Sequence, residues 1–110
     1  MPASTEEEVF RAVADATRRE ILDLLSGGER PAGEIADAFP VSRPAVSRHL
    51  RMLREADLVA SRKEGRRRLY SLNPEPLRKV DEWVSRYERF WGASLERLKA
   101  HVERDRKRRE

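Results

Sequence analysis

One segment restricts the possible folds more than any other, an amphipathic stretch over residues 42–56 that carries arginines on one side. Val46, Leu50 and Leu53 follow one another at intervals of four and three residues, which places them on one face of a helix. The hydroxyl of Ser42 is suited to cap the first turn of that helix. We therefore predict a helix that packs its apolar face inward and leaves a basic face uncovered.

Three helices are expected before this segment, over about residues 6–14, 16–26 and 31–39. Acidic residues open the first of them, and its apolar residues fall at helical spacing. A glycine pair after residue 26 ends the second, and a proline after residue 39 ends the third. The third helix and the basic helix, joined by a short turn, then form a helix-turn-helix.

Two short strands are expected after the basic helix, over residues 58–63 and 66–72, around a turn at Glu64-Gly65. Glu-Gly is a weaker hairpin signal than Asn-Gly or Asp-Gly. A last helix is expected from about residue 74 to beyond residue 101. Its apolar residues lie three or four apart throughout, as one continuous seam: Leu77, Val80, Val84, Tyr87, Trp91, Leu95, Leu98 and Val102.

The charge of the chain is unevenly distributed, although its net value is only +4. Residues 41–68 hold nine basic and three acidic side chains, whereas residues 1–40 hold four basic and nine acidic ones. A concentrated basic stretch is what a surface that follows a phosphate backbone needs, although a solvated basic face has the same composition. A basic helix after a short turn, with a basic hairpin behind it, favours double-stranded DNA as the partner.

In such a module the second helix enters the major groove and the hairpin, or wing, lies along the backbone. Arginine presents two donors to guanine, and arginines at a wing tip reach phosphates or a narrow minor groove. The expected groove contacts are Ser42, Arg43, Ser47, Arg48, His49 and Arg51, with packing as the alternative role for His49 beside the apolar stripe. The expected wing contacts are Arg62, Lys63, Arg66, Arg67 and Arg68.

This order of elements predicts the fold class, mainly α (α+β): a winged helix-turn-helix in the order α-α-α-α-β-β-α with a long C-terminal dimerisation helix. Residues 1–103 are expected to form one DNA-binding and dimerisation domain, followed by a charged, frayed tail over 104–110. A helix of about 25 residues is about 37 Å long, more than so small a core covers. We therefore predict a homodimer whose interface holds Val9, Phe10, Val13, Val80, Val84, Tyr87, Trp91, Leu95 and Leu98.

Several other classes of protein are disfavoured. The chain has no cysteine, which excludes disulfides, thiolate metal sites and cysteine nucleophiles. No apolar run approaches the roughly 20 residues that cross a bilayer, and residues 1–8 are too acidic for a secretory signal. Ser47 and His49 point to different faces of one helix, so they do not pair as nucleophile and base. We expect a cytoplasmic protein that is not an enzyme and uses no cofactor or membrane.

Four segments resemble the ArsR family of winged-helix repressors: FRAVADATRREILDLL (10–25), RPAGEIADAF (30–39), VSRPAVSRHLRMLREADLV (41–59) and EGRRRLYSLNPEPLRKVDEW (64–83). The resemblance covers about residues 6–102, with the metal-free branch of the family as the nearest likeness. It implies a homodimer built from the first and last helices, a palindromic operator and repression by blocking polymerase.

The family's metal sites are not matched. Many members sense metals through cysteines on the third helix, where this chain has no thiol over residues 34–38. Others bind zinc with Asp-x-His and a later histidine on the last helix. Here Asp81 is followed by Glu82 and Trp83, and His101 stands alone as a histidine of that helix. These residues do not assemble four zinc ligands, so no metal is expected.

Two alternatives stay open. One is a winged-helix module for protein or RNA contacts without sequence-specific DNA binding, although the arginines of the basic helix disfavour the protein-binding form. The other is an effector pocket lined by Trp83, Tyr87, Phe90 and Trp91, although such a stripe is more often dimer core. The effector itself is unknown. The operator is expected to be an inverted repeat whose half-sites lie about one helical turn, ~34 Å, apart.

Overall fold

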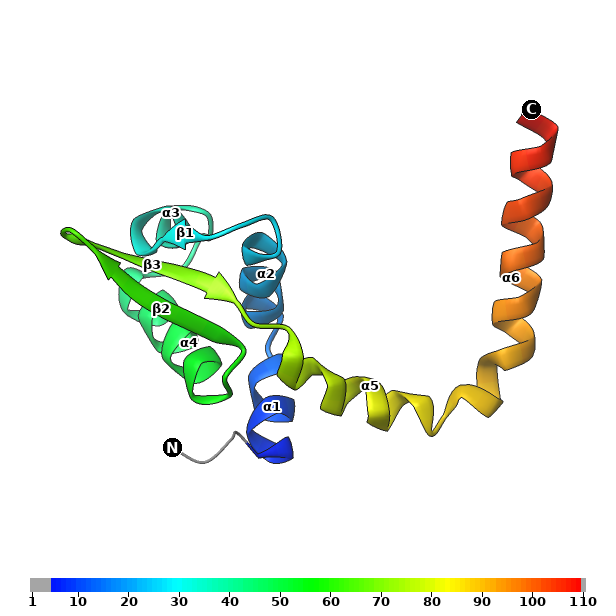
Figure 1. Cartoon of the computed structure of the whole chain (residues 1–110), viewed down its shortest axis with the longest axis horizontal. Coiled ribbons are helices and arrows are strands. Elements are labelled where there is room, and N and C mark those ends of the chain that lie inside the picture. The colour runs from blue at the N-terminus through cyan, green and yellow to red at the C-terminus, as the bar shows by residue number, and fades with distance from the viewer. Residues whose placement is uncertain (1–4, 110) are drawn as a thin grey trace. The chain divides into compact units, whose positions relative to one another are not determined.

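The computed structural model describes residues 5–109, apart from the side chains of 93–96, 108 and 109. The chain divides into two units, one ending at Val80 and the other beginning at Asp81. In the first unit the helices are α1 (Glu6–Val13), α2 (Ala16–Leu25), α3 (Ala32–Asp37) and α4 (Arg43–Glu55). Figure 1 labels them, and their order confirms the four predicted helices.

Three of these helices begin with a side-chain cap. Thr5 and Glu8 form a capping box at the start of α1, and Asp15 accepts the backbone N–H of Arg18 at 3.0 Å at the start of α2. Ser42 accepts the backbone N–H of Ala45 at 3.2 Å, which confirms its predicted role as the cap of α4. Each cap satisfies an N–H that the first helical turn leaves unpaired.

The sheet contains β1 (Arg30–Pro31), β2 (Val59–Glu64) and β3 (Arg67–Leu72), in the antiparallel order β1-β3-β2. Prediction missed β1 because two residues that include a proline carry no alternating pattern. The hairpin turn also lies one residue later than expected. Gly65 and Arg66 form it, so Glu64 ends β2, and Gly65 takes a φ of +61° that suits glycine.

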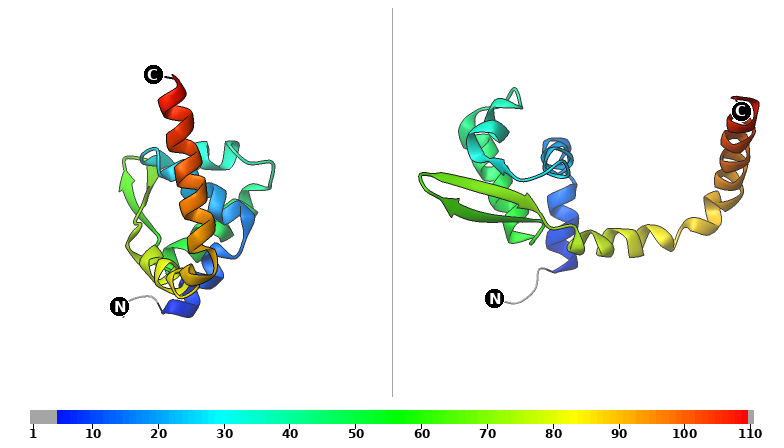
Figure 2. Two further views of the ribbon diagram at one scale, coloured as in Figure 1. Left: turned by 90° about the vertical axis from the view of Figure 1, so that its right-hand side faces the viewer. Right: turned by 45° about the horizontal axis from the view of Figure 1, so that its top comes forward.

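The core joins the helices to the base of the hairpin, and Figure 2 shows the hairpin tip projecting beyond them. The predicted inward stripe of α4 is confirmed, since Val46, Leu50 and Leu53 are buried. Ile21 and Ile35 are completely buried against them. Burying the α4 stripe fixes which of its residues face outward.

The predicted last helix is interrupted, and its expected continuity is wrong. A short 3₁₀ turn (Glu75–Leu77) precedes α5 (Arg78–Ser85), and α6 (Glu88–Arg109) follows after two turn residues, Arg86 and Tyr87. Arg86 and Tyr87 each donate a backbone N–H to the carbonyl three residues before, at 3.2 and 2.9 Å. The Ser85 hydroxyl also donates to the carbonyl of Glu82 at 2.7 Å, which competes with regular helix bonding.

The charged end of the chain is helical rather than frayed as far as it is described, since α6 extends to Arg109. The division into a domain over 1–103 and a tail over 104–110 stays a prediction.

Candidate nucleic-acid interface

The face of α4 opposite the core carries polar and basic side chains. Arg43, Ser47, Arg48 and Arg51 are all exposed there, as predicted from the apolar stripe. Arg43 makes one weak exposed contact, to Asp37 of α3 at 3.4 Å. The segment over 38–42 joins α3 to α4 and completes the helix-turn-helix. The outward face of α4 can therefore present hydrogen-bond donors to a ligand while the opposite face of the helix stays packed in the core.

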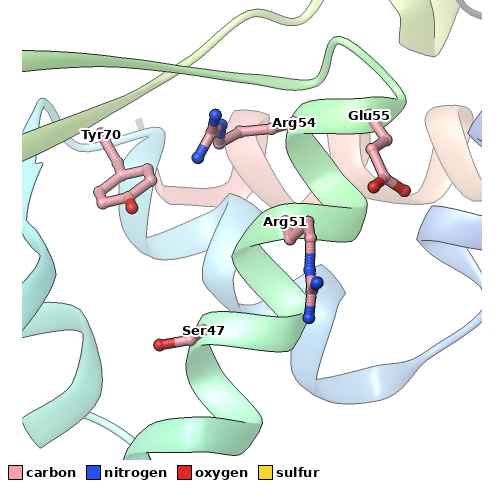
Figure 3. A pocket seen from close by; sticks show the side chains of 5 residues that line it. All are labelled: Ser47, Arg51, Arg54, Glu55 and Tyr70. Carbon is pink, nitrogen blue, oxygen red and sulfur yellow. The ribbon is translucent and has the colours of Figure 1, made fainter.

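An open hollow of about 560 Å³ lies between α4 and β3. Ser47, Arg51, Arg54 and Glu55 line it from α4, and Tyr70 lines it from β3 (Figure 3). Ser47, Arg51 and Arg54 stand at i, i+4 and i+7, so one side of the helix supplies all three. The predicted contact set omitted Arg54, which this spacing identifies. It also omitted Tyr70, whose place depends on strand pairing that the sequence does not show.

The wing brings a second group of basic residues into one place. Lys63, Arg66, Arg67 and Arg68 are exposed on or beside the hairpin turn, and Arg68 donates to the Ser61 hydroxyl at 3.1 Å. A hollow of about 320 Å³ is lined by residues 66–68 of the wing and 31–33 at the start of α3. The sheet thus adds three arginines to the edge of the helix-turn-helix.

Arg62 differs from the other predicted wing contacts, because its guanidinium is already paired. It donates two hydrogen bonds to the carboxylate of Glu29, at 2.8 and 3.0 Å. These bonds hold the pKa of Glu29 below its usual value and raise the pKa of Arg62. The positive charge of Arg62 is therefore paired with the negative charge of Glu29.

His49 packs toward α2. Its Nδ1 accepts from a guanidinium nitrogen of Arg18 at 3.2 Å and lies 3.9 Å from a carboxylate oxygen of Asp15. Arg18 is itself buried, and it also donates to the carbonyls of Ala12 at 2.7 Å and Arg11 at 2.9 Å. The pKa of Asp15 is lowered, first by the backbone N–H of Arg18 and then by the charge of the Arg18 guanidinium. The packing alternative for His49 therefore has direct support, and its DNA contact stays a prediction.

Comparison with known proteins identifies the family. The model described as "Bacterial regulatory protein, arsR family" matches residues 15–61, which span α2 to the start of β2. The transcriptional repressor SdpR of Bacillus subtilis is 43% identical over 76 residues, 69% of this chain and 84% of that protein. The HTH-type transcriptional regulator Rv2034 of Mycobacterium tuberculosis is 43% identical over 89 residues, 81% of this chain and 80% of that protein. The chain belongs to the ArsR family.

Solved structures agree with this assignment. An ArsR-family transcriptional regulator, RHA00566, matches with a TM-score of 0.69 and 30% identity, over 78% of this chain and 94% of that chain. The fragment Mb0332 from Mycobacterium bovis, described as a homodimeric winged helix-turn-helix DNA-binding domain, matches with a TM-score of 0.61 and 32% identity, over 78% and 82%. This ArsR-family chain therefore has the winged helix-turn-helix fold predicted from its sequence.

The residues predicted at the dimer interface fall into two groups in this ArsR-family chain. Within the first unit Val9 is completely buried in its own core, so it has no surface left for a partner. Phe10, Val13 and Val80 are half-buried. The second unit carries exposed apolar side chains: Trp83, Val84, Tyr87, Phe90, Trp91, Leu98 and Val102. The side chain of Leu95 lies outside the described residues.

Among the described residues, no group of three or more histidine, cysteine, aspartate or glutamate side chains is placed to hold a metal ion. No described helix combines the length and the apolar character that crossing a membrane requires.

Proposed function

We propose that this ArsR-family chain is a homodimeric repressor that binds an inverted-repeat DNA operator, with α4 in the major groove. The observation that carries the proposal is the outward face of α4. Its arginines are exposed on a helix whose opposite face is fixed in the core. The names of the similar proteins, among them a transcriptional repressor and several operon repressors, support the same function.

The proposed contacts divide into two sets. Arg48 and Arg51 hydrogen-bond guanine bases in the groove, because a guanidinium reaches both O6 and N7. Ser47 and Arg43 bind base edges or phosphate beside them. The exposed cations of the wing, Lys63 and the arginines at 66–68, neutralise phosphates along the backbone or enter the minor groove.

The proposed dimer rests on the exposed apolar side chains from Trp83 onward. Trp83 and Tyr87 stack edge to face at 5.6 Å between ring centres, and Tyr87 lies 6.3 Å from Phe90. Exposed aromatic clusters of this kind are enriched at protein interfaces. The homodimeric Mb0332 fragment supports a second copy of this chain as the occupant. The effector pocket remains the alternative use of these rings.

We also propose that the protein acts in the cytoplasm and has no enzymatic activity. A protein- or RNA-binding winged helix is the second candidate function. It is disfavoured by the density of arginine on α4, because arginine and guanine geometry match in a duplex groove.

The decisive experiment is a mobility shift on the DNA upstream of the gene for this protein, with unrelated competitor DNA at two salt concentrations. We expect a sharp complex with two protomers per site that survives the competitor. The double variant Arg48→Gln/Arg51→Gln is expected to lose this complex, since each guanine contact contributes about 1–3 kcal/mol of discrimination.

A matched control is Arg19→Gln/Arg78→Gln, which removes the same charge from two exposed positions away from α4 and the wing. The control should bind the operator almost as the wild type does. Equal binding by the wild type and the α4 variant would contradict the proposal. Stable binding to single-stranded RNA in preference to the duplex would favour the second candidate.

A further inference from the structure

Arg62 projects from the wing, yet its charge is held by two carboxylates. Its Nε donates to Glu29 Oε2 at 3.0 Å and a terminal nitrogen donates to Glu29 Oε1 at 2.8 Å, in parallel bonds of fork geometry. The same terminal nitrogen lies 3.0 Å from a carboxylate oxygen of Glu64. Such a bidentate pair has a defined orientation, unlike a loose surface ion pair.

The pair with Glu29 spans the whole width of the sheet. Glu29 directly precedes β1 and Arg62 belongs to β2, while β3 lies between these two strands. Two outer strands of a three-stranded sheet are about 9.6 Å apart. The side chains of Arg62 and Glu29 must both extend over β3 to meet across this distance. The link between them therefore crosses the central strand.

Leu69 of β3 lies beneath this link. It stands directly opposite Arg62 on one side and Pro31 on the other. Its neighbour Tyr70 belongs to the core, and successive side chains of a strand point to opposite faces, so Leu69 lies on the outer face. Leu69 is nevertheless only 5% exposed. An Arg62 side chain that extends over β3 to reach Glu29 would cover Leu69 with its aliphatic stem.

We propose that Arg62 is a positioning residue of the wing rather than a DNA contact. Together with Glu29 it straps β2 across β3 and holds the hairpin at the angle from which its other basic residues reach phosphate. The inference rests on the proposed function, because it concerns how the same interface is oriented.

The test measures operator affinity between about 50 and 200 mM salt for Glu29→Gln, Arg62→Gln, their double variant and the control Arg67→Gln. Loss of a phosphate contact in the control should reduce the log–log salt slope by about 0.9 per protomer. The loss of operator affinity between these two salt concentrations then becomes about 3.5-fold smaller for each protomer. The three strap variants should keep the wild-type slope. Each should bind up to about fivefold more weakly per protomer of the dimer, the effect of one well-oriented ion pair in each.

The double variant should bind no more weakly than the weaker single variant, because both substitutions break one link. A slope for Arg62→Gln that falls as it does for Arg67→Gln would overturn the proposal, and so would tighter binding by Glu29→Gln. An unchanged operator affinity with only a lower melting temperature would overturn it too, since it would leave a purely structural role.

A second measurement separates the strap from the proposed function. In ¹⁵N-labelled wild-type protein without DNA, the Nε–H signal of Arg62 should be protected from exchange, and Glu29→Gln should abolish that protection. Addition of operator should leave the signal in place. Failure of the wild type to bind any operator would reject the proposed function, while the Nε–H signal would still decide whether the strap exists.

Discussion

Replacement of buried Arg18 by methionine tests how α1, α2 and α4 are held together. The guanidinium donates to two carbonyls at the end of α1 and to Nδ1 of His49 on α4. Methionine keeps most of the apolar stem but removes all three bonds. A hydrogen bond from a charged group contributes about 1.5–3 kcal/mol, and loss of one partner from a buried charged network costs about 3–5 kcal/mol. We expect Arg18→Met to lower the free energy of unfolding by about 3–5 kcal/mol.

The assay is urea unfolding followed by circular dichroism, at one protomer concentration because dimerisation shifts apparent stability. Arg19→Met is a matched control at the next residue. Arg19 is exposed and donates one hydrogen bond, to the carbonyl of Val13 at 2.8 Å, so its loss should cost less than about 1.5 kcal/mol. Both substitutions remove one positive charge. If Arg18→Met were no more destabilising than Arg19→Met, the reasoning from burial and bond number would be refuted.

Three other outcomes are expected. The pKa of Asp15 lies below its unfolded value of 3.8, so the ionised carboxylate stabilises the fold above that pH. The wild type should therefore be more stable than Asp15→Asn in urea unfolding above about pH 5. This difference in stability should shrink as the pH falls below about 5. Gly65→Ala should cost about 1–2 kcal/mol in the same assay, because alanine disfavours a φ of +61°. Trp91→Glu should raise the dimer dissociation constant at least about 30-fold by sedimentation, whereas Arg97→Glu, on the same helix, should change it little.

The helices of the first unit were predictable because each carries its own signal. The stripe of α4 repeats at helical spacing, and Ser42 marks its start. The break after α5 was not predictable from this kind of pattern, since the apolar spacing of three and four continues through Arg86 and Tyr87. A periodic seam reports which residues share a side, and it does not require the backbone to stay helical between them.

The candidate DNA interface was predictable in part, because the apolar stripe of α4 also fixes which residues of that helix face outward. Exposure of Arg48 and Arg51 follows from the position of the core stripe on the opposite face of the helix. The roles of Arg62 and His49 do not follow, because their partners come from distant parts of the chain. Glu29 is 33 residues before Arg62, and Arg18 is 31 residues before His49. From the sequence alone, such residues look available to bind DNA. The fold shows that they already form bonds within the protein.

These engagements limit the strength of the proposed DNA contact. Of the basic residues predicted to meet DNA, Arg43 and Arg62 form ion pairs and His49 is held by Arg18. Within residues 5–109 the structure shows no ion pair for the remaining six: Arg48, Arg51, Lys63, Arg66, Arg67 and Arg68. Twelve phosphate contacts in a dimer give a salt slope no steeper than about −11. A steeper measured slope would mean that DNA draws Arg62 or Arg43 out of its pair. A slope of about −7, the value for eight contacts in the dimer, would assign Arg48 and Arg51 to bases instead of phosphates.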